Sequence, residues 1–415
     1  MRTFRVSIAF LFVALFLVPT TSKSIPAFAR KYGFNCNMCH TAYTKLNDFG
    51  QRYRDNGYQI PGQAGGEKTV FETPPPIALR TTTGLSVYSD TSGGTTAGFN
   101  IFGLDFLAAG VLHKNISFLL IYTPRIDEPG SDYTGANPAQ PGGMESAALV
   151  FSNIVRDALD IRVGRFEPAY HPFSSKRKYN IFAPYEVYTF TTPNNGFVFD
   201  DNQIGIEATG HVAGGFKYGA GVVNGSGANP DLNAAKDFYA NLFQTFGKGD
   251  GQSAGQRIGA FGYYGWQPTK PGTVIAPTGE TNGKENKPFY RWGADASLNY
   301  EMLNLALLFM GGSDDKALNP FDSTAKYSYT GGFAELNWAG LLDNRMVVSL
   351  MYNWVSPPSN DLARQVNAYS ALLRYYLGDW SAVNVAIHAE YTFRKTGKDN
   401  PLKEHQFALI LDFDF

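Results

Sequence analysis

From Ile77 to the C-terminus the chain is a series of short segments in which apolar and polar residues alternate. The clearest segment runs from Ala382 to Arg394. One of its faces carries Val383, Val385, Ile387, Ala389, Tyr391 and Phe393, and the other carries Asn384, Ala386, His388, Glu390, Thr392 and Arg394. A period of two residues is that of a β-strand. A lipid-facing row opposite a water-facing row explains why the two faces differ.

About sixteen such segments can be counted in this part of the chain. They begin near Ile77, Phe99, Ile116, Met144, Leu159, Ile204, Phe216, Lys236, Arg257, Phe289, Leu303, Tyr327, Met346, Val366, Ala382 and Gln406. Most are close to the ~9–11 residues with which a tilted strand crosses a bilayer. Long connections, such as 127–143, 168–203 and 268–288, tend to alternate with short ones. This rhythm is typical of short periplasmic turns and long external loops in bacterial barrels.

We therefore predict an all-β fold, a transmembrane outer-membrane β-barrel of about sixteen strands over residues 77–415. The five tryptophans lie near predicted strand ends, where interfacial aromatic girdles occur. The last residues, Phe407, Leu409, Leu411, Phe413 and Phe415, resemble the C-terminal recognition strand of outer-membrane barrels. A soluble β-protein, the alternative, would need an apolar interior and a polar exterior.

Composition agrees with a barrel. The 415 residues include 44 Gly, 32 Phe and 24 Tyr, yet the mean hydropathy is only −0.21. Strands that alternate apolar and polar residues keep the average hydropathy low even in a membrane protein. The formal net charge of −1 gives no basic field for binding nucleic acid.

The N-terminus is typical of a secretory signal peptide, which we place at residues 1–22. Arg2 and Arg5 precede an apolar run over 6–18, and cleavage fits after Ser22 or Ser24. The run is shorter than the ~20 residues of a transmembrane helix, which disfavours a membrane anchor. We therefore expect an exported protein located in the bacterial outer membrane.

The chain holds only two cysteines, and both belong to the sequence Cys36-Asn37-Met38-Cys39-His40. This C-x-x-C-H pattern is the attachment signature of c-type haem. Two thiols one turn apart reach the two vinyl groups of one porphyrin, and the adjacent imidazole binds the iron. A zinc site would need further ligands, and a thioredoxin-like pair would need an α/β context. We predict one covalent haem c on Cys36 and Cys39, with His40 as axial iron ligand.

The chain is therefore expected to have two parts after the signal peptide. Residues 25–58 form a small α-helical monohaem cytochrome c segment, in which Leu46, Phe49 and Tyr53 recur at helical spacing. Residues 59–76 form a linker that is rich in Gly and ends in Pro74, Pro75 and Pro76. A segment of this length has little core of its own, so it needs the haem, the barrel or both to fold.

The sixth iron ligand is open at this point. No His or Met lies between Thr41 and Pro76, and Met38 is inside the attachment loop. Either the barrel supplies a distal ligand, or the iron is five-coordinate, water-ligated or bound by a weaker donor. Strand parity places four candidates on the inner face of the barrel: Met310, Met351, His211 and His388.

The N-terminal part resembles the fused cytochrome–porins of iron(II)-oxidising bacteria. The resemblance rests on Pro26-Ala27-Phe28-Ala29-Arg30-Lys31-Tyr32-Gly33-Phe34, the haem motif, Leu46-Asn47-Asp48-Phe49-Gly50 and Asn56-Gly57-Tyr58. In that family a monohaem cytochrome precedes an outer-membrane porin of about sixteen strands. The resemblance implies that Cys36 and Cys39 attach the haem and that His40 is the proximal ligand.

With this organisation we expect an electron conduit. Extracellular Fe(II) would be the electron donor and a periplasmic c-type cytochrome the electron acceptor. The chain would then have Fe(II):cytochrome c oxidoreductase activity. Two alternatives remain: outward electron transfer by the same parts, and a solute porin whose haem is structural or sensory.

Acidic groups in the predicted external loops could recruit the cation, because carboxylates bind hard or borderline metal ions. They are Asp127, Glu128 and Asp132, then Asp200 and Asp201, then Asp314 and Asp315. Their alternative role is an ordinary solvated loop surface.

Overall fold

The computed structural model describes residues 27–34, 38–42, 44–63, 65–73, 77–124, 143–212, 214–227, 229, 231, 233–247, 256–268, 286–380 and 383–414. Several predicted features lie outside the described residues: the signal peptide, Cys36, Pro74 to Pro76, the cluster of Asp127, Glu128 and Asp132, and Phe415. Within the described part of the chain, no helix is long and apolar enough to cross a membrane.

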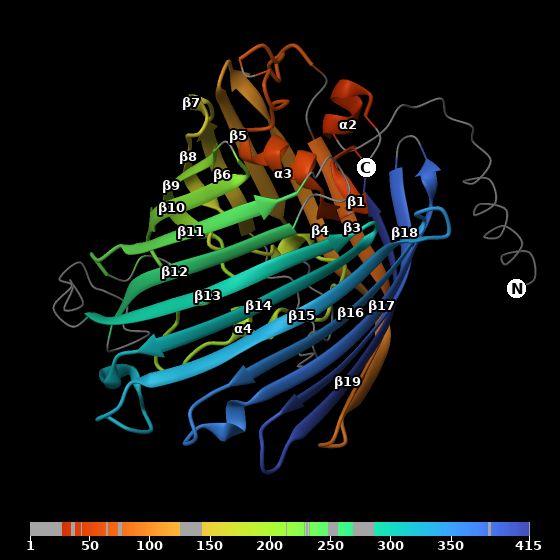
Figure 1. The fold of residues 1–415 in the computed structure, drawn as a ribbon. Coiled ribbons are helices and arrows are strands. Elements are labelled where there is room, and N and C mark those ends of the chain that lie inside the picture. The colour runs from red at the N-terminus through yellow and green to blue at the C-terminus, as the bar shows by residue number, and fades with distance from the viewer. Residues whose placement is uncertain are drawn as a thin grey trace, which may run out of the picture.

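Sixteen antiparallel strands close into a barrel, in which the last strand pairs with the first (Figure 1). The strands are β3 (Ile77–Asp90), β4 (Thr95–His113), β5 (Ile116–Thr123), β6 (Gly143–Phe151), β8 (Asp160–Phe166), β9 (Gln203–Val212), β10 (Phe216–Val223), β11 (Asp237–Phe246), β12 (Gln256–Pro268), β13 (Asn286–Tyr300), β14 (Leu303–Asp314), β15 (Tyr327–Leu341), β16 (Met346–Ser356), β17 (Val366–Trp380), β18 (Val383–Thr396) and β19 (Leu402–Asp414). A short strand, β7 (Ile154–Asp157), lies in the turn between β6 and β8. The predicted fold class is confirmed.

The predicted alternation is also present. On β18, Ile387 and Tyr391 are exposed on the outer face, while His388 and Glu390 are buried inside the barrel. The predicted and observed strand starts differ most at β4 and β19. These strands begin at Thr95 and Leu402, four residues before the predicted starts at Phe99 and Gln406. Both strands are extended by exposed residues that pair beyond the apolar band.

The N-terminal segment lies at the end of the barrel where β3 begins (Figure 1). It consists of α2 (Ala27–Tyr32), a two-stranded ladder of β1 (His40–Ala42) and β2 (Lys45–Leu46), and α3 (Asp48–Asp55). Asn47 begins α3 as its N-cap, because its side chain accepts a hydrogen bond from the Gly50 backbone N–H at 2.9 Å. The predicted helical structure of this segment is thus present, in α2 and α3. The β1–β2 ladder was not indicated by the sequence.

The long connection between β8 and β9 folds into the barrel, which corrects our prediction of an external loop over 168–203. It includes the short helices η2 (Ser175–Arg177) and α4 (Glu186–Thr189), and α4 lies within the barrel (Figure 1). The physical reason is its aromatic content. Tyr170, Tyr185, Tyr188, Phe197 and Phe199 are buried in one core with inward-facing residues of β11 to β17.

Buried polar contacts hold this inner loop in place. The Glu390 carboxylate on β18 accepts hydrogen bonds from the backbone N–H groups of Ile181, Phe182 and Ala183, at 2.8, 3.1 and 3.0 Å. Arg394, also on β18, forms an ion pair with Glu186 of α4 at 2.8 Å. Buried backbone N–H groups must be paired, so these side chains help fix the path of the loop.

Two of the three predicted acidic clusters are placed differently from our expectation. Asp314 is fully buried, with 0% exposure, and pairs with Arg291 at 2.5 Å and with Asn195 of the inner loop at 3.1 Å. It therefore holds the loop instead of facing solvent. Asp200 and Asp201 lie at the end of the same inward-folded loop and are only partly exposed. Asp315 accepts a hydrogen bond from Ala317 N at 2.9 Å and so begins the short helix η4 (Lys316–Leu318).

Candidate functional site: the haem motif at the barrel mouth

The described part of the haem motif is fixed against α3. The Asn47 backbone N–H donates to the Cys39 carbonyl at 2.9 Å, and the Asn47 side chain donates to the Met38 carbonyl at 3.0 Å. A Cβ on Gly50 would lie 2.1 Å from the Cys39 carbonyl oxygen, so only glycine permits this approach. The sequence Asn47-Asp48-Phe49-Gly50 therefore positions Cys39 and His40 at the start of β1.

An aromatic cluster lies next to the motif. Tyr53 is 5% exposed, and the rings of Phe28 and Tyr58 are stacked with centroids 5.2 Å apart. The Phe28 and Tyr53 rings meet edge to face, also at 5.2 Å. Burial, together with nearby groups that include Tyr32 and Cys39, raises the pKa of the Tyr53 hydroxyl, so this side chain is neutral. Flat apolar side chains beside a cysteine suit a large planar cofactor.

The chemistry of the donor set also fits a c-type haem. Burial lowers the pKa of His40 to about 4, so its imidazole is neutral at physiological pH and keeps a lone pair for a metal ion. Cys39 lies one residue earlier, and Cys36, the other predicted attachment residue, is outside the described residues. In the described ranges, no group of three or more His, Cys, Asp or Glu side chains is arranged to hold a metal ion.

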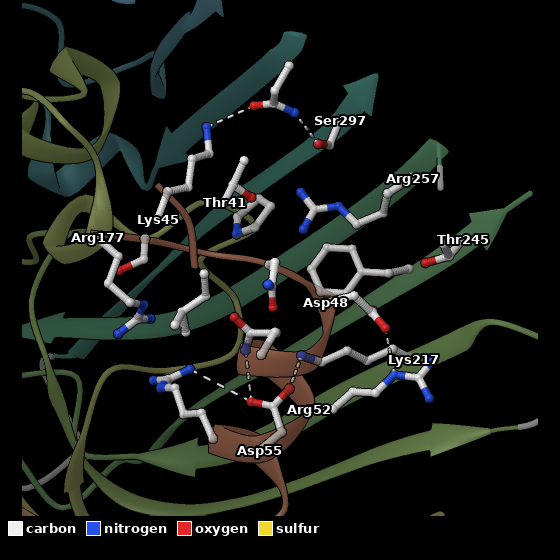
Figure 2. A pocket seen from close by; sticks show the side chains of 18 of the residues that line it. Thr41, Lys45, Asp48, Arg52, Asp55, Arg177, Lys217, Thr245, Arg257 and Ser297 are labelled. Carbon is white, nitrogen blue, oxygen red and sulfur yellow. Dashed lines mark hydrogen bonds and ion pairs between the residues drawn. The ribbon is translucent and has the colours of Figure 1, made fainter. Parts of the chain in front are cut away.

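A polar cavity of about 380 Å³ separates α3 from the opposite wall of the barrel (Figure 2). Asp48, Arg52 and Asp55 of α3 line one side of it. The barrel contributes Lys217, Thr245, Arg257 and Ser297, and Thr41, Lys45 and Arg177 complete the labelled lining. The cavity is therefore lined by charges of both signs.

Ion pairs across this cavity attach the haem segment to the barrel. The Asp55 carboxylate binds the Lys217 ammonium of β10 and lies 3.1 Å from Nε2 of His211 on β9. Arg54 reaches Glu167 of the inner loop at 3.2 Å. Lys45 donates to the Asn304 side chain on β14 at 2.8 Å. These contacts join the haem segment to β9, β10, β14 and the inner loop.

Replacing Asp55 with Asn should loosen this attachment, because Lys217 and His211 would lose their charged partner. We expect a loss of about 1–3 kcal/mol in the docking free energy of α3. Hydrogen exchange of residues 48–55 measures the effect. Asp48→Asn is the matched control on the same helix. In the described residues Asp48 forms one ion pair, with the half-exposed Arg52 at 3.0 Å, so its substitution should cost no more than about 0.5 kcal/mol. Equal exchange in the two variants would contradict the prediction.

The same contact predicts a pH dependence. Burial by itself raises the pKa of Asp55, but Lys217, His211 and Arg54 outweigh burial and hold the pKa well below its usual value. The stabilisation is therefore complete above the unfolded-state pKa of about 4 and is lost as the pH falls below it. Faster exchange of α3 below about pH 4 in the wild type, but not in Asp55→Asn, is the expected result.

The four predicted distal-ligand candidates all face the interior, but they lie in different surroundings. Met310 and Met351 are buried in the aromatic core beside the inner loop. His211 is bound to Asp55. His388 is fully buried on β18, with 0% exposure.

Two further residues near the haem segment were missed by our sequence reasoning. His171 lines the cavity from the inner loop, and Met302 lines it from the turn between β13 and β14. Neither residue lies on a strand, so the alternation of strand residues does not indicate whether its side chain faces the lumen. The aromatic residues around His171, at Tyr170 and Phe173, are the signal that could have placed its loop inside.

Comparison with known proteins identifies the fold. No protein-family model matches the chain, and no curated protein matches it. The Salmonella typhi OmpF in complex with daunomycin has 10% identity and a TM-score of 0.58, and covers 84% of this chain and 100% of its own. An anion-selective porin from Comamonas acidovorans has 13% identity, a TM-score of 0.56, and coverage of 82% and 99%. Pseudomonas putida OprB has 14% identity, a TM-score of 0.51, and coverage of 82% and 94%. The barrel has the fold of outer-membrane porins, which supports a location in the outer membrane.

Proposed function

We propose that this chain is an outer-membrane electron conduit that carries one covalent haem c at the periplasmic mouth of a porin-like barrel. It would take one electron from each extracellular Fe(II) and deliver it to a periplasmic c-type cytochrome. The observation that carries the proposal is the position of the C-x-x-C-H segment. Its described residues pack on α3, and Asp55 of α3 and the nearby Lys45 bind the mouth of a barrel in which the inner loop forms a buried aromatic core.

Each part of the chain has a role in this proposal. The haem, when bound, supplies a one-electron centre. Cys36 and Cys39 would retain it covalently in an open compartment, and neutral His40 would bind the iron. The pairs Asp55–Lys217 and Lys45–Asn304 hold the segment against the wall. A redox centre tied to a membrane-spanning structure is closer to the outside than one on a freely diffusing periplasmic protein.

The inner loop favours transfer of electrons over passage of solutes. Tyr188, Phe199 and Phe333 are each at most 1% exposed, and rings of the loop contact rings of the wall. A packed aromatic core restricts the path of hydrated solutes, whereas electrons need no open channel. It also suits a reaction whose Fe(III) product is poorly soluble and must remain outside the cell.

A solute porin with a structural or sensory haem is the second candidate. The porin fold of the neighbours favours it, and so does the charged cavity beside α3. Ion conductance distinguishes the two, because a conduit of the proposed kind should conduct poorly in planar bilayers. Outward electron transfer would use the same parts, and the direction of reduction distinguishes it.

The test uses haem-loaded protein in proteoliposomes that contain a soluble c-type cytochrome. Orientation is determined by protease access to the barrel loops. Under anaerobic conditions, Fe(II) added only to the side of the membrane that carries the long external loops should reduce the haem and then the cytochrome enclosed in the vesicles. Protein with Cys36→Ala and Cys39→Ala is the control and should transfer no electrons. Haem that is reduced readily from the periplasmic side but never by external Fe(II) would instead support outward transfer, and a large open-channel conductance without reduction would support the porin.

A further inference from the structure

Two lysines lie opposite each other on the outer face of the barrel wall. Lys395 of β18 and Lys403 of β19 are direct cross-strand partners, and both belong to the outward-facing rows of their strands. Within the described ranges neither forms an ion pair, and the neighbouring carboxylate of Glu404 faces inward, where it pairs with Arg394. Like charges directly opposite each other on one face of a sheet repel, so an anion bound between the two lysines would be stabilising.

The two lysines lie at the external end of the lipid-facing wall. The first residues of β19 pair with the last residues of β3, whereas the haem segment lies where β3 begins (Figure 1). The lysines are therefore at the opposite end of the barrel, where the longer connections lie. On β18 the outward-facing residues from Val383 to Phe393 are apolar or aromatic, and Lys395 is the first charge after them. This level is the one at which lipid chains give way to head groups.

A ring cluster, formed by Tyr369, Tyr391, Phe393 and His405, covers the wall next to the lysines. The centroid of the Phe393 ring lies 6.4 Å from that of Tyr369 and 5.0 Å from that of His405. The Tyr391 hydroxyl is hydrogen-bonded to Nδ1 of His405 at 2.8 Å, which fixes both side chains. Phe393 is two residues from Lys395, a step of about 6–7 Å along a strand. Aromatic residues at this level are typical of the interfacial girdle of a barrel.

Further toward the middle of the membrane, the outer face contains an apolar groove of about 510 Å³. Two small residues, Ala334 of β15 and Ala371 of β17, line it together with the larger Leu336 and Leu350, which are 41% and 49% exposed. Tyr391 lines the groove and is the cross-strand partner of Ala371, so the groove is continuous with the ring cluster. Lipid chains are as apolar as the wall, so such a groove acts through van der Waals packing.

The charge of this face distinguishes between two occupants. A second copy of the chain, related by a two-fold axis along the membrane normal, would present the same patch at the same level. Its Lys395 and Lys403 would then meet the same two lysines, and four like charges would come together. A lipid with an anionic head group instead supplies the missing negative charge next to the lysines and an acyl chain for the groove.

We propose that the outer face of β17 to β19 binds one lipid of the outer leaflet that has an anionic phosphate head group. The phosphate lies between Lys395 and Lys403, whose ammonium groups donate charge-assisted hydrogen bonds to its oxygens. One acyl chain passes the ring cluster and lies in the groove beside Ala371. The site is on the lipid side of the wall and involves neither the haem segment nor the lumen, so it is independent of the electron transfer proposed above.

The experiment measures lipid binding to the full chain in detergent by native mass spectrometry. The probe is a synthetic bisphosphorylated diglucosamine lipid with saturated acyl chains, and the wild type should retain one molecule per chain. The double variant Lys395→Gln with Lys403→Gln should bind it at least about tenfold more weakly, because two charge-assisted hydrogen bonds are lost. The wild type should bind the dephosphorylated form of the lipid just as weakly. Ala371→Trp fills the groove but keeps both lysines, and it should weaken binding of the probe several-fold.

A matched control removes the same charge elsewhere at the external end. Lys316 and Lys326 are exposed in the connection between β14 and β15, and the double variant Lys316→Gln with Lys326→Gln should bind the probe like the wild type. Heat-modifiable gel migration reports whether each variant folds. If a variant does not fold, the comparison of the phosphorylated and dephosphorylated lipids on the wild type decides.

Four results would overturn the inference. The first is unchanged binding in the Lys395 and Lys403 variant, and the second is an equal loss in the control. The third is displacement of the lipid by excess inorganic phosphate, which would mean that the lysines bind free anions. The fourth is a lipid-free oligomer that Ala371→Trp dissociates, because the groove would then be covered by a second copy of the chain.

Discussion

Protein in which Cys36 and Cys39 are both replaced by alanine is expected to carry no covalent haem, while its barrel still folds. The two thioether bonds need both thiols, and the chain has no other cysteine. The barrel should survive because its sixteen strands are held by their own ladder and by the inner loop. Haem staining of denatured protein and its pyridine spectrum measure the loss, and heat-modifiable gel migration measures the barrel.

Met38→Ala is the matched control for this prediction. Met38 lies between the two cysteines, is 41% exposed, and takes part in the α3 contact through its backbone carbonyl. The variant should therefore keep its covalent haem. If acid–acetone extraction removes the haem from the wild type, the attachment is not covalent and the motif has another role.

Strand positions could be predicted because a barrel wall separates two solvents. Lipid on one side and a polar or packed interior on the other impose a period of two, which Ile387, His388 and Glu390 show directly. Strand ends were less certain, since pairing continues beyond the apolar band at Thr95 and Leu402. The alternation also predicted correctly that four side chains face the interior: Met310, Met351, His211 and His388.

The path of the connection after β8 could not be predicted from its length. Its length predicts an external loop, yet its aromatic residues are buried in the lumen. The error extended to Asp314, whose carboxylate binds the inner loop through Asn195. A carboxylate next to a strand end is expected to face solvent unless a buried cation pairs with it. The pattern of residues did not indicate that Arg291, the partner of Asp314, is buried.

The attachment of the haem segment to the barrel was likewise beyond sequence reasoning. Asp55 and Lys217 are 162 residues apart, and nothing in the local pattern of α3 indicates which strand it faces. The motif predicts a cofactor because Cys36, Cys39 and His40 are close in sequence. The contacts that position the motif depend on closure of the whole barrel.

Glu390→Ala should release the inner loop and raise the ion conductance of the barrel. The substitution removes the carboxylate that accepts three backbone hydrogen bonds, from Ile181, Phe182 and Ala183. Each buried N–H left without a partner costs about 1–3 kcal/mol, so the docked position of the loop loses several kcal/mol. Single-channel recording in planar bilayers measures the conductance, which we expect to rise several-fold.

Glu404→Ala provides the control on the adjacent strand β19. Glu404 binds Tyr88 and reaches the inner loop only through Arg394, with which it pairs at 2.9 Å and which keeps its ion pair with Glu186, so conductance should rise much less than in Glu390→Ala. If Glu390→Ala conducts no more than the wild type and unfolds at the same temperature, the carboxylate does not hold the loop. A wild type that already conducts as an open porin would show that the aromatic core leaves a continuous water path, and the solute-porin function would then become the better explanation of this fold.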